Sequence, residues 1–174
     1  MRKLYFFTSV VILSFVLAFG GRLISRAAAG PDDDRASIQA QRDGYVKAVL
    51  ARDVDKVMSY YAPGSQLFVF DLVPPRSYPS AEAYKKDWQE LFAAFPGPVT
   101  TSVTESSVTV AGTVAYSHEA QPFKMTRKDG TFFEAVIRVT DVYRKIDGKW
   151  LIVQEHVSVP VDLETGKADF LSKP

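Results

Sequence analysis

The chain has 174 residues, of which 47% are apolar and 13% aromatic, enough for the packed core of one domain and too apolar for disorder throughout. It contains no cysteine, which excludes disulfides, thiolate zinc sites and a thiol nucleophile. The formal charge of +1 is unevenly distributed, because residues 1–29 hold four basic side chains and no acid. The rest has 17 basic against 20 acidic residues, and a mildly acidic body without a basic cluster argues against nucleic-acid binding.

The N-terminal segment has the pattern of a secretory signal. Met1-Arg2-Lys3 is followed by the uncharged apolar run 4–20 and by Ala27-Ala28-Ala29, which predicts a signal peptide over residues 1–29. The run of 17 residues is also just long enough for an uncleaved membrane anchor, and only then would the protein contact a membrane. Either interpretation exports the protein, to the periplasm or outside the cell. Residues 30–160 then form the domain, and residues 161–174 an extended polar tail.

Three helices are predicted in the first half of the domain. Pro31 and the acidic run after it start the first helix, Asp53 caps the second and Ser80 the third. The segment 65–72 between the second and third helices predicts a short strand that ends near Asp71. The third helix carries an apolar stripe, made of Tyr84, Trp88, Leu91, Phe92 and Phe95.

From residue 99 onward the spacing of the apolar residues changes from that of a helix to every second residue, as in a strand. Strands are predicted over 99–110, 113–123, 131–145 and 149–159, separated by turns that each contain a glycine. Helices followed by long antiparallel strands indicate an α+β fold, with helices packed on one face of a curved, mostly antiparallel sheet. Such a sheet leaves a concave apolar pocket, which suits a small molecule.

The last hairpin can pair in two ways around Asp147-Gly148. A three-residue loop over 146–148 sets Arg138 opposite His156, on one face with Trp150, Ile152, Gln154 and Ser158. A two-residue loop sets His156 opposite Val139 instead, and separates it from Arg138. We favour the first, because Trp150 and the polar strand ends then share a surface.

The chain resembles the nuclear transport factor 2-like superfamily, which includes SnoaL-like proteins and ketosteroid isomerases. The residues that carry this resemblance cover about 35–160: Tyr45-Val46-x-Ala48-x-x-Ala51-x-Asp53-x-Asp55-x-Val57, Tyr61-Ala62, the strand ending at Asp71, Arg138-x-Thr140-x-Val142, Asp147-Gly148-Lys149-Trp150 and His156-x-Ser158. The resemblance implies a cone-shaped, cystatin-like fold of three N-terminal helices on a curved sheet. It implies little about function, because this fold hosts isomerases, dehydratases, cyclases and non-catalytic modules.

The resemblance to the isomerases suggests catalytic roles for four residues. Tyr45 matches the tyrosine that donates a hydrogen bond to the enolate, and Asp71 falls close to the general base. Arg138 stands where the isomerases have a second, protonated aspartate, and a permanent cation could stabilise an oxyanion or bind a carboxylate. His156 is a further candidate acid or base. Structural alternatives are an ion pair for Arg138, a turn cap for Asp71, core packing for Tyr45, and a hydrogen bond to the backbone at the end of the sheet for His156.

The hairpin also resembles the association domain of calcium/calmodulin-dependent kinase II. That likeness implies an oligomerising module in which Arg138 and His156 hold a small carboxylic acid. Further candidate ligand contacts are Tyr61, Phe70, Trp88, His118 and Ser158. A homodimer is implied by resemblance. No phosphate loop, dinucleotide glycine fingerprint or Gly-x-Ser-x-Gly elbow occurs, so no cofactor is expected. A metal site of one or two histidines with carboxylates stays open.

Two functions therefore remain. The first is cofactor-free acid–base chemistry next to a carbonyl, as in an isomerase, dehydratase or cyclase, on a small hydrophobic molecule. The second is non-catalytic binding of a small acid, or assembly. An enzyme requires Asp71 unpaired and facing the pocket, whereas a binding module should show Asp71 held by Arg138.

Overall fold

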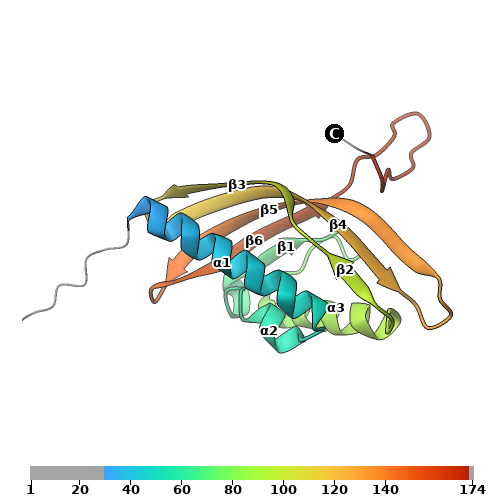
Figure 1. Ribbon diagram of the computed structural model, residues 1–174, viewed down its shortest axis with the longest axis horizontal. Helices are drawn as coiled ribbons and strands as arrows, with labels where there is room; N and C mark the ends of the chain where they lie inside the picture. Colours follow the sequence, from blue (N-terminus) through green and yellow to red (C-terminus); the bar gives the residue numbers. More distant parts are fainter. Residues whose placement is uncertain (1–29, 173–174) are drawn as a thin grey trace, which may run out of the picture.

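The computed structural model describes residues 30–172. This part of the chain folds into three α-helices and a six-stranded sheet. Figure 1 shows the strands as one curved layer, with the helices on its concave side. This is the α+β architecture predicted from the sequence. The predicted signal peptide or anchor lies outside the described residues. Within 30–172 no helix combines the length and the apolar character needed to cross a membrane.

The helices begin where the sequence places their caps. Helix α1 spans Pro31–Leu50 and has three aspartates in its first turn, where negative side chains stabilise the positive end of the helix dipole. Helix α2 spans Val54–Met58, and Asp53 accepts a hydrogen bond from the Lys56 amide at 2.9 Å. Helix α3 spans Ala81–Ala94, and the Ser80 hydroxyl accepts from the Ala83 amide at 3.3 Å.

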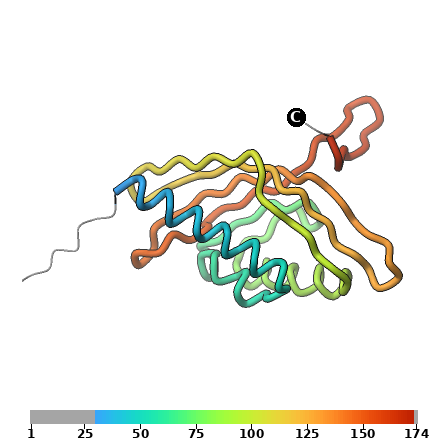
Figure 2. The backbone as a smooth tube through the Cα atoms, viewed as in Figure 1, coloured from blue at the N-terminus to red at the C-terminus, as the bar shows by residue number. Residues whose placement is uncertain are grey.

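The sheet has the strand order β1-β6-β5-β4-β2, with β3 also paired to β4. Strand β1 (Phe68–Phe70), after the 3₁₀ turn η1 (Gly64–Gln66), runs parallel to β6 (Lys149–Ser158). The other pairs are antiparallel, and they include β4 (Val114–Thr126) and β5 (Phe132–Ile146). The strand predicted over 99–110 is divided into β2 (Val99–Thr101) and β3 (Thr104–Ala111). Ser102 and Val103 separate the two strands, and a register shift follows within β3, between Thr104 and Ser107. Figure 2 shows the chain bending in this region.

The predicted register of the last hairpin is wrong. Strands β5 and β6 are joined by a two-residue turn, with Ile146 opposite Lys149, but the pairing shifts between Val142 and Tyr143. Val153 is thereby left without a partner, as the extra residue of a β-bulge. Arg138 consequently faces Ser158, and His156 faces Thr140.

The bulge changes which side chains of β6 face the helices. Trp150 and Ile152 are buried before the bulge, and Glu155 and Val157 are buried after it. His156 is exposed, as Arg138 is on the neighbouring strand. The helix-facing surface of β6 therefore combines even-numbered residues before Val153 with odd-numbered residues after it.

The C-terminal tail folds back on the open edge of the sheet instead of extending freely. The Val136 amide donates a hydrogen bond to the Phe170 carbonyl at 2.7 Å. The rings of Phe133 and Phe170 meet edge to face, with centroids 5.4 Å apart. The tail thus covers the part of β5 that β6 is too short to reach.

A buried ion pair connects α1 to the sheet. Arg42 of α1 and Glu119 of β4 are 4% and 6% exposed, and their side chains form a salt bridge. The Gln121 amide donates a second hydrogen bond to Glu119. Removing one charge of such a pair leaves the other buried without compensation.

We therefore expect Arg42→Met to destabilise the fold by about 3–5 kcal/mol. The double variant Arg42→Met/Glu119→Gln should recover a large part of this loss, because no unpaired charge remains in the core. Urea unfolding followed by circular dichroism measures both values. Additive losses in the double variant would contradict the prediction.

Candidate functional site

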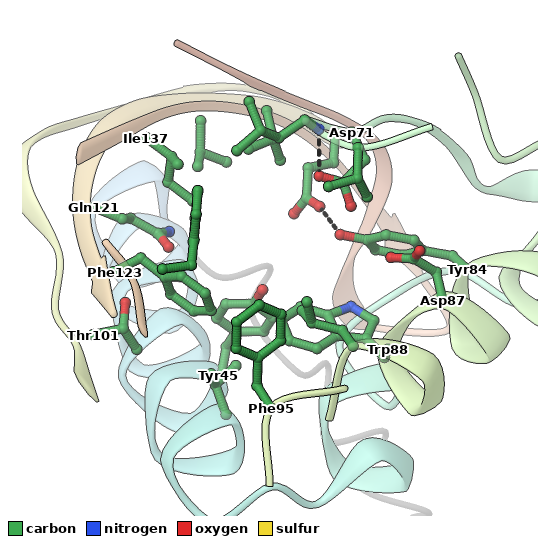
Figure 3. A pocket seen from close by; sticks show the side chains of 18 of the residues that line it. Tyr45, Asp71, Tyr84, Asp87, Trp88, Phe95, Thr101, Gln121, Phe123 and Ile137 are labelled. Atoms are coloured by element: carbon green, nitrogen blue, oxygen red, sulfur yellow. Dashed lines mark hydrogen bonds between the residues drawn. The ribbon is translucent and has the colours of Figure 1, made fainter. Parts of the chain in front are cut away.

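A cavity of about 300 Å³ lies between the concave face of the sheet and helices α1 and α3. Its walls are mostly apolar and aromatic, and Figure 3 shows these side chains converging on a common space. Polar groups are concentrated on one wall, which carries Asp71, Tyr84 and Asp87. The apolar lining includes Val49, Leu72, Leu91, Phe95, Phe123, Phe133, Ile137, Val139 and Val157.

Asp71 follows the end of β1 and lines this cavity. One carboxylate oxygen accepts a hydrogen bond from the Leu72 amide at 2.5 Å. Burial raises the pKa of Asp71 to about 6; the Leu72 hydrogen bond opposes this rise, and the nearby Asp87 adds to it. Within residues 30–172, Asp71 forms no salt bridge with Arg138 or any other cation. A carboxyl that titrates near neutral pH in an apolar cavity has the properties of a general base.

Glu155 is a second carboxyl of the cavity wall and is only 3% exposed. It accepts hydrogen bonds from the Tyr61 hydroxyl at 2.8 Å and from the Tyr84 hydroxyl at 2.7 Å. Burial, reinforced by the charge of Asp141, raises its pKa well above the usual range. Asp141 lies directly opposite on β5, and burial raises its pKa to about 6. Such coupled acids favour a state in which they share a proton.

Asp87 is the third acid of the cavity, and it is contributed by α3. The Tyr78 hydroxyl donates a hydrogen bond to its Oδ1 atom at 2.6 Å. Burial raises the pKa of Asp87, and the Tyr78 hydrogen bond opposes this effect. The sequence analysis missed Asp87 and Glu155. Asp87 had a detectable signal, since it lies on the apolar stripe of α3, three residues after Tyr84 and four before Leu91.

Aromatic side chains of α1 and α3 form a further part of the lining. The rings of Tyr45 and Tyr84 meet the Trp88 indole edge to face, at 6.3 and 6.2 Å. Burial raises the pKa of the Tyr45 hydroxyl, so it remains a donor at any physiological pH. The Trp88 indole N–H and the Thr101 hydroxyl are buried without hydrogen-bond partners in the described chain. Unpaired buried donors of this kind are rare in folded proteins.

A much smaller space of about 10 Å³ adjoins the cavity and shares Tyr45, Gln121 and Glu155 with it. This volume corresponds to roughly one water molecule. Arg42 and Asp141 also line it, and both keep buried polar atoms without hydrogen-bond partners in the described part of the chain.

The structure brings some of the predicted site residues together and separates others. Tyr45, Asp71 and Trp88 line the cavity, and Tyr61 lies just behind it through its bond to Glu155. The remaining five do not line it: Phe70, His118, Arg138, His156 and Ser158. Their side chains belong to the outer face of the sheet, where His118 and His156 both pair with Thr140. The shared pocket expected for Arg138 and His156 is therefore absent from the described structure, because the bulge turns Glu155 inward in place of His156.

No three His, Asp or Glu side chains among residues 30–172 converge in a way that would hold a metal ion. The polar wall instead carries carboxyl groups hydrogen-bonded by tyrosines. Such an arrangement suits proton transfer, which needs acids with shifted pKa values and donors fixed around them.

Comparison with known proteins agrees with this architecture. The model of the SnoaL-like domain matches residues 38–162, most of the chain. The chain belongs to the SnoaL-like family. No curated protein matches this SnoaL-like chain.

Three solved structures illustrate the range of relatives. A nuclear transport factor 2-like protein of unknown function from Pseudomonas putida is 26% identical, with 82% of this chain and 98% of that chain covered and a TM-score of 0.72. A ketosteroid isomerase-like protein from Erwinia carotovora is 18% identical (71% and 93% covered, TM-score 0.60). A candidate calcium/calmodulin-dependent protein kinase II association domain from Xanthomonas campestris is 24% identical (76% and 89% covered, TM-score 0.61). The SnoaL-like fold is thus shared by relatives with both enzymatic and non-enzymatic names.

The raised pKa of Asp71 predicts that the stability of the folded protein depends on pH. Because its pKa rises from 3.8 in the unfolded chain to about 6 in the fold, folding takes up a proton between these values. The contribution of Asp71 to the free energy of unfolding is therefore greatest below about pH 4, and it is lost as the pH rises through 6.

The variant Asp71→Asn cannot ionise and should escape this loss. We expect it to equal the parent protein near pH 4 and to be more stable by roughly 2–3 kcal/mol near pH 8. Denaturant unfolding at a series of pH values measures the difference. A constant difference between the two proteins at all pH values would contradict the raised pKa.

Proposed function

We propose that this protein is a cofactor-free enzyme that moves a proton at a carbon next to a carbonyl group. The observation that carries the proposal is Asp71, a carboxyl with a pKa of about 6 that lines an apolar cavity without a cationic partner in the described chain. This is the arrangement that distinguishes a free base from a carboxylate held in an ion pair. Isomerases, dehydratases and cyclases all share this first step.

The reaction would begin with the Asp71 carboxylate, which removes a proton from the carbon and leaves an enolate. The negative charge moves to the carbonyl oxygen, where hydrogen-bond donors stabilise it. The hydroxyl of Tyr45, whose side chain lines the cavity, is the donor that we assign to this oxygen. Protonated Asp71 then returns its proton to another carbon, or to a leaving hydroxyl group.

Glu155 supports this chemistry through the side chains that it holds in place. It holds the hydroxyls of Tyr61 and Tyr84 and, through them, fixes the aromatic wall beside Asp71. Its raised pKa favours the neutral form, which avoids a second full negative charge near the enolate. The resemblance suggested that Arg138 stabilises the oxyanion, but Arg138 does not line the cavity. In this proposal a neutral hydroxyl donor takes that role.

The proposal can be tested with 2-tetralone, a bicyclic ketone with exchangeable protons next to its carbonyl. In D₂O near pH 7.5 the protein should accelerate deuterium incorporation, followed by proton NMR. Asp71→Asn should lower the accelerated rate by about 100-fold or more, the usual contribution of a general base. Arg138→Ala, on the outer face, is the matched control and should retain the full rate.

Binding of the ketone is measured separately, by thermal shift. If Asp71→Asn binds 2-tetralone and exchanges its protons as fast as the parent protein, Asp71 is not the base. If the parent protein binds the ketone without accelerating exchange, the non-catalytic alternative gains support.

The outer face of the sheet supports a second role, in assembly. Phe68 and Phe70 are each 39% exposed there, and Tyr116 is 50% exposed. The Phe70 ring contacts the His156 ring, with centroids 5.6 Å apart. Exposed aromatic rings on a sheet face are common at protein interfaces, and we infer that this face joins two copies of the chain.

We expect light scattering of the purified protein to give the mass of a dimer, and Phe70→Arg to give that of a monomer. Leu163→Arg is the control, because Leu163 is 94% exposed but lies in the tail, away from this face. A monomeric parent protein, or a dimer insensitive to Phe70→Arg, would contradict the inferred interface.

A further inference from the structure

We propose that the cavity selects a ligand with a positively charged amine, and that Asp87 of α3 is its counter-ion. The inference rests on the proposed function in taking the same cavity as the ligand site, and it adds the chemical class of the ligand. It is a statement about binding, so it can hold or fail whether or not a proton is transferred.

Most of the charged side chains that line the cavity are acidic. Asp71, Asp87 and Glu155 are acidic, whereas Arg127 is the basic residue among the lining side chains. Arg127 is exposed, and its guanidinium lies over the Phe95 ring, 4.3 Å from the centroid. None of the three acids has a salt bridge within residues 30–172. A carboxylate ligand would meet like charges in a space of low dielectric, whereas a cation would be attracted.

Asp87 is the acid best placed to contact a charged group. Its neighbour Trp88 and the residue one turn earlier, Tyr84, both line the cavity, so the carboxyl lies among aromatic rings on one face of α3. The Tyr78 hydroxyl holds Oδ1 at 2.6 Å and thereby fixes the carboxyl group. In Figure 3 the side chains of Asp71 and Asp87 lie on the same wall, beside Tyr84. A cation next to Asp87 would relieve the repulsion between these two acids.

The aromatic lining favours a cation for an independent reason. The rings of Tyr45, Tyr84 and Trp88 are packed together at 6.2–6.3 Å and form part of the cavity wall. Aromatic faces attract ammonium groups, with tryptophan the strongest, and the attraction increases when the site is shielded from water. An acidic group beside several aromatic rings is the usual composition of an ammonium site.

Three naphthalene probes of matched size test the charge preference: 2-naphthylmethylamine, 2-naphthalenemethanol and 2-naphthoate. Isothermal titration near pH 7.5 should show that the amine binds about tenfold more tightly than the alcohol, with the carboxylate the weakest. Asp87→Asn keeps the shape and the acceptor for Tyr78 but removes the charge, and it should bring amine and alcohol within about twofold. Glu82→Gln is the matched control, because Glu82 is on the same helix, outside the lining, and the amine preference should persist.

The pH dependence in the parent protein gives a second test that does not rely on a variant. The amine should bind more tightly as the pH rises from about 5 to about 7.5, because Asp71, whose pKa is about 6, ionises over this range and adds a second negative charge beside Asp87 while the amine stays charged. The groups that act on Asp87 are Tyr78, Glu90 and Asp71. Affinity for the alcohol should not rise in this way.

Three results would overturn the proposal: an alcohol that binds as tightly as the amine, no measurable binding of the amine at millimolar concentration, or an amine preference that survives Asp87→Asn. These results leave the proposed reaction untouched, because it is judged by deuterium exchange in a ketone without an amine. Conversely, amine binding without any exchange in 2-tetralone would retain the ligand class and remove the enzymatic role.

Discussion

A single residue without a cross-strand partner, Val153, decides which side chains of β6 face the helices. Without this bulge, strict alternation from Trp150 would place His156 in the interior and Glu155 on the outer face. The bulge reverses the alternation midway along the strand and brings Glu155 opposite Asp141 beneath the cavity. The place of Glu155 in the lining, its bonds to the Tyr61 and Tyr84 hydroxyls, and the absence of His156 from the lining all depend on this one residue.

Burying several carboxyl groups is costly unless each is neutralised or hydrogen-bonded. The structure meets this constraint in different ways along the concave face. Glu119 has Arg42 as its partner, Glu155 has two tyrosine hydroxyls, and Asp141 accepts a hydrogen bond from the Tyr143 hydroxyl at 3.0 Å. Asp71 has a backbone amide and the Tyr84 hydroxyl as donors, with Asp87 nearby as a like charge. Its pKa of about 6 shows that these contacts do not fully offset its burial, which is expected when stability is sacrificed for function.

Much of the fold could be predicted from local rules, but less of the site. Asp53 and Ser80 marked helix starts through capping chemistry, and the change of apolar period marked the sheet. The run Leu151-Ile152-Val153 has no alternation that would reveal a bulge, so the register, and with it Arg138 and His156, was misplaced. Asp71 and Tyr45 were proposed through resemblance, and both line the cavity. Asp87 could have been found from the sequence, because a charge within an apolar helical stripe requires an explanation.

The sheet also separates charges of opposite sign. Arg138 lies on the outer face, Arg42 is engaged by Glu119, and the cavity keeps three acids without a salt bridge in the described chain. Glu155 is compensated by its two tyrosine hydroxyls and by a raised pKa that favours the neutral form. Among residues 30–172, Asp71 and Asp87 have no cation of the kind that Arg42 provides for Glu119, and a ligand that supplies a positive charge would explain their place in an aromatic wall. On this argument the shared SnoaL-like fold provides the cavity, while the few acids on its wall determine which molecules it accepts.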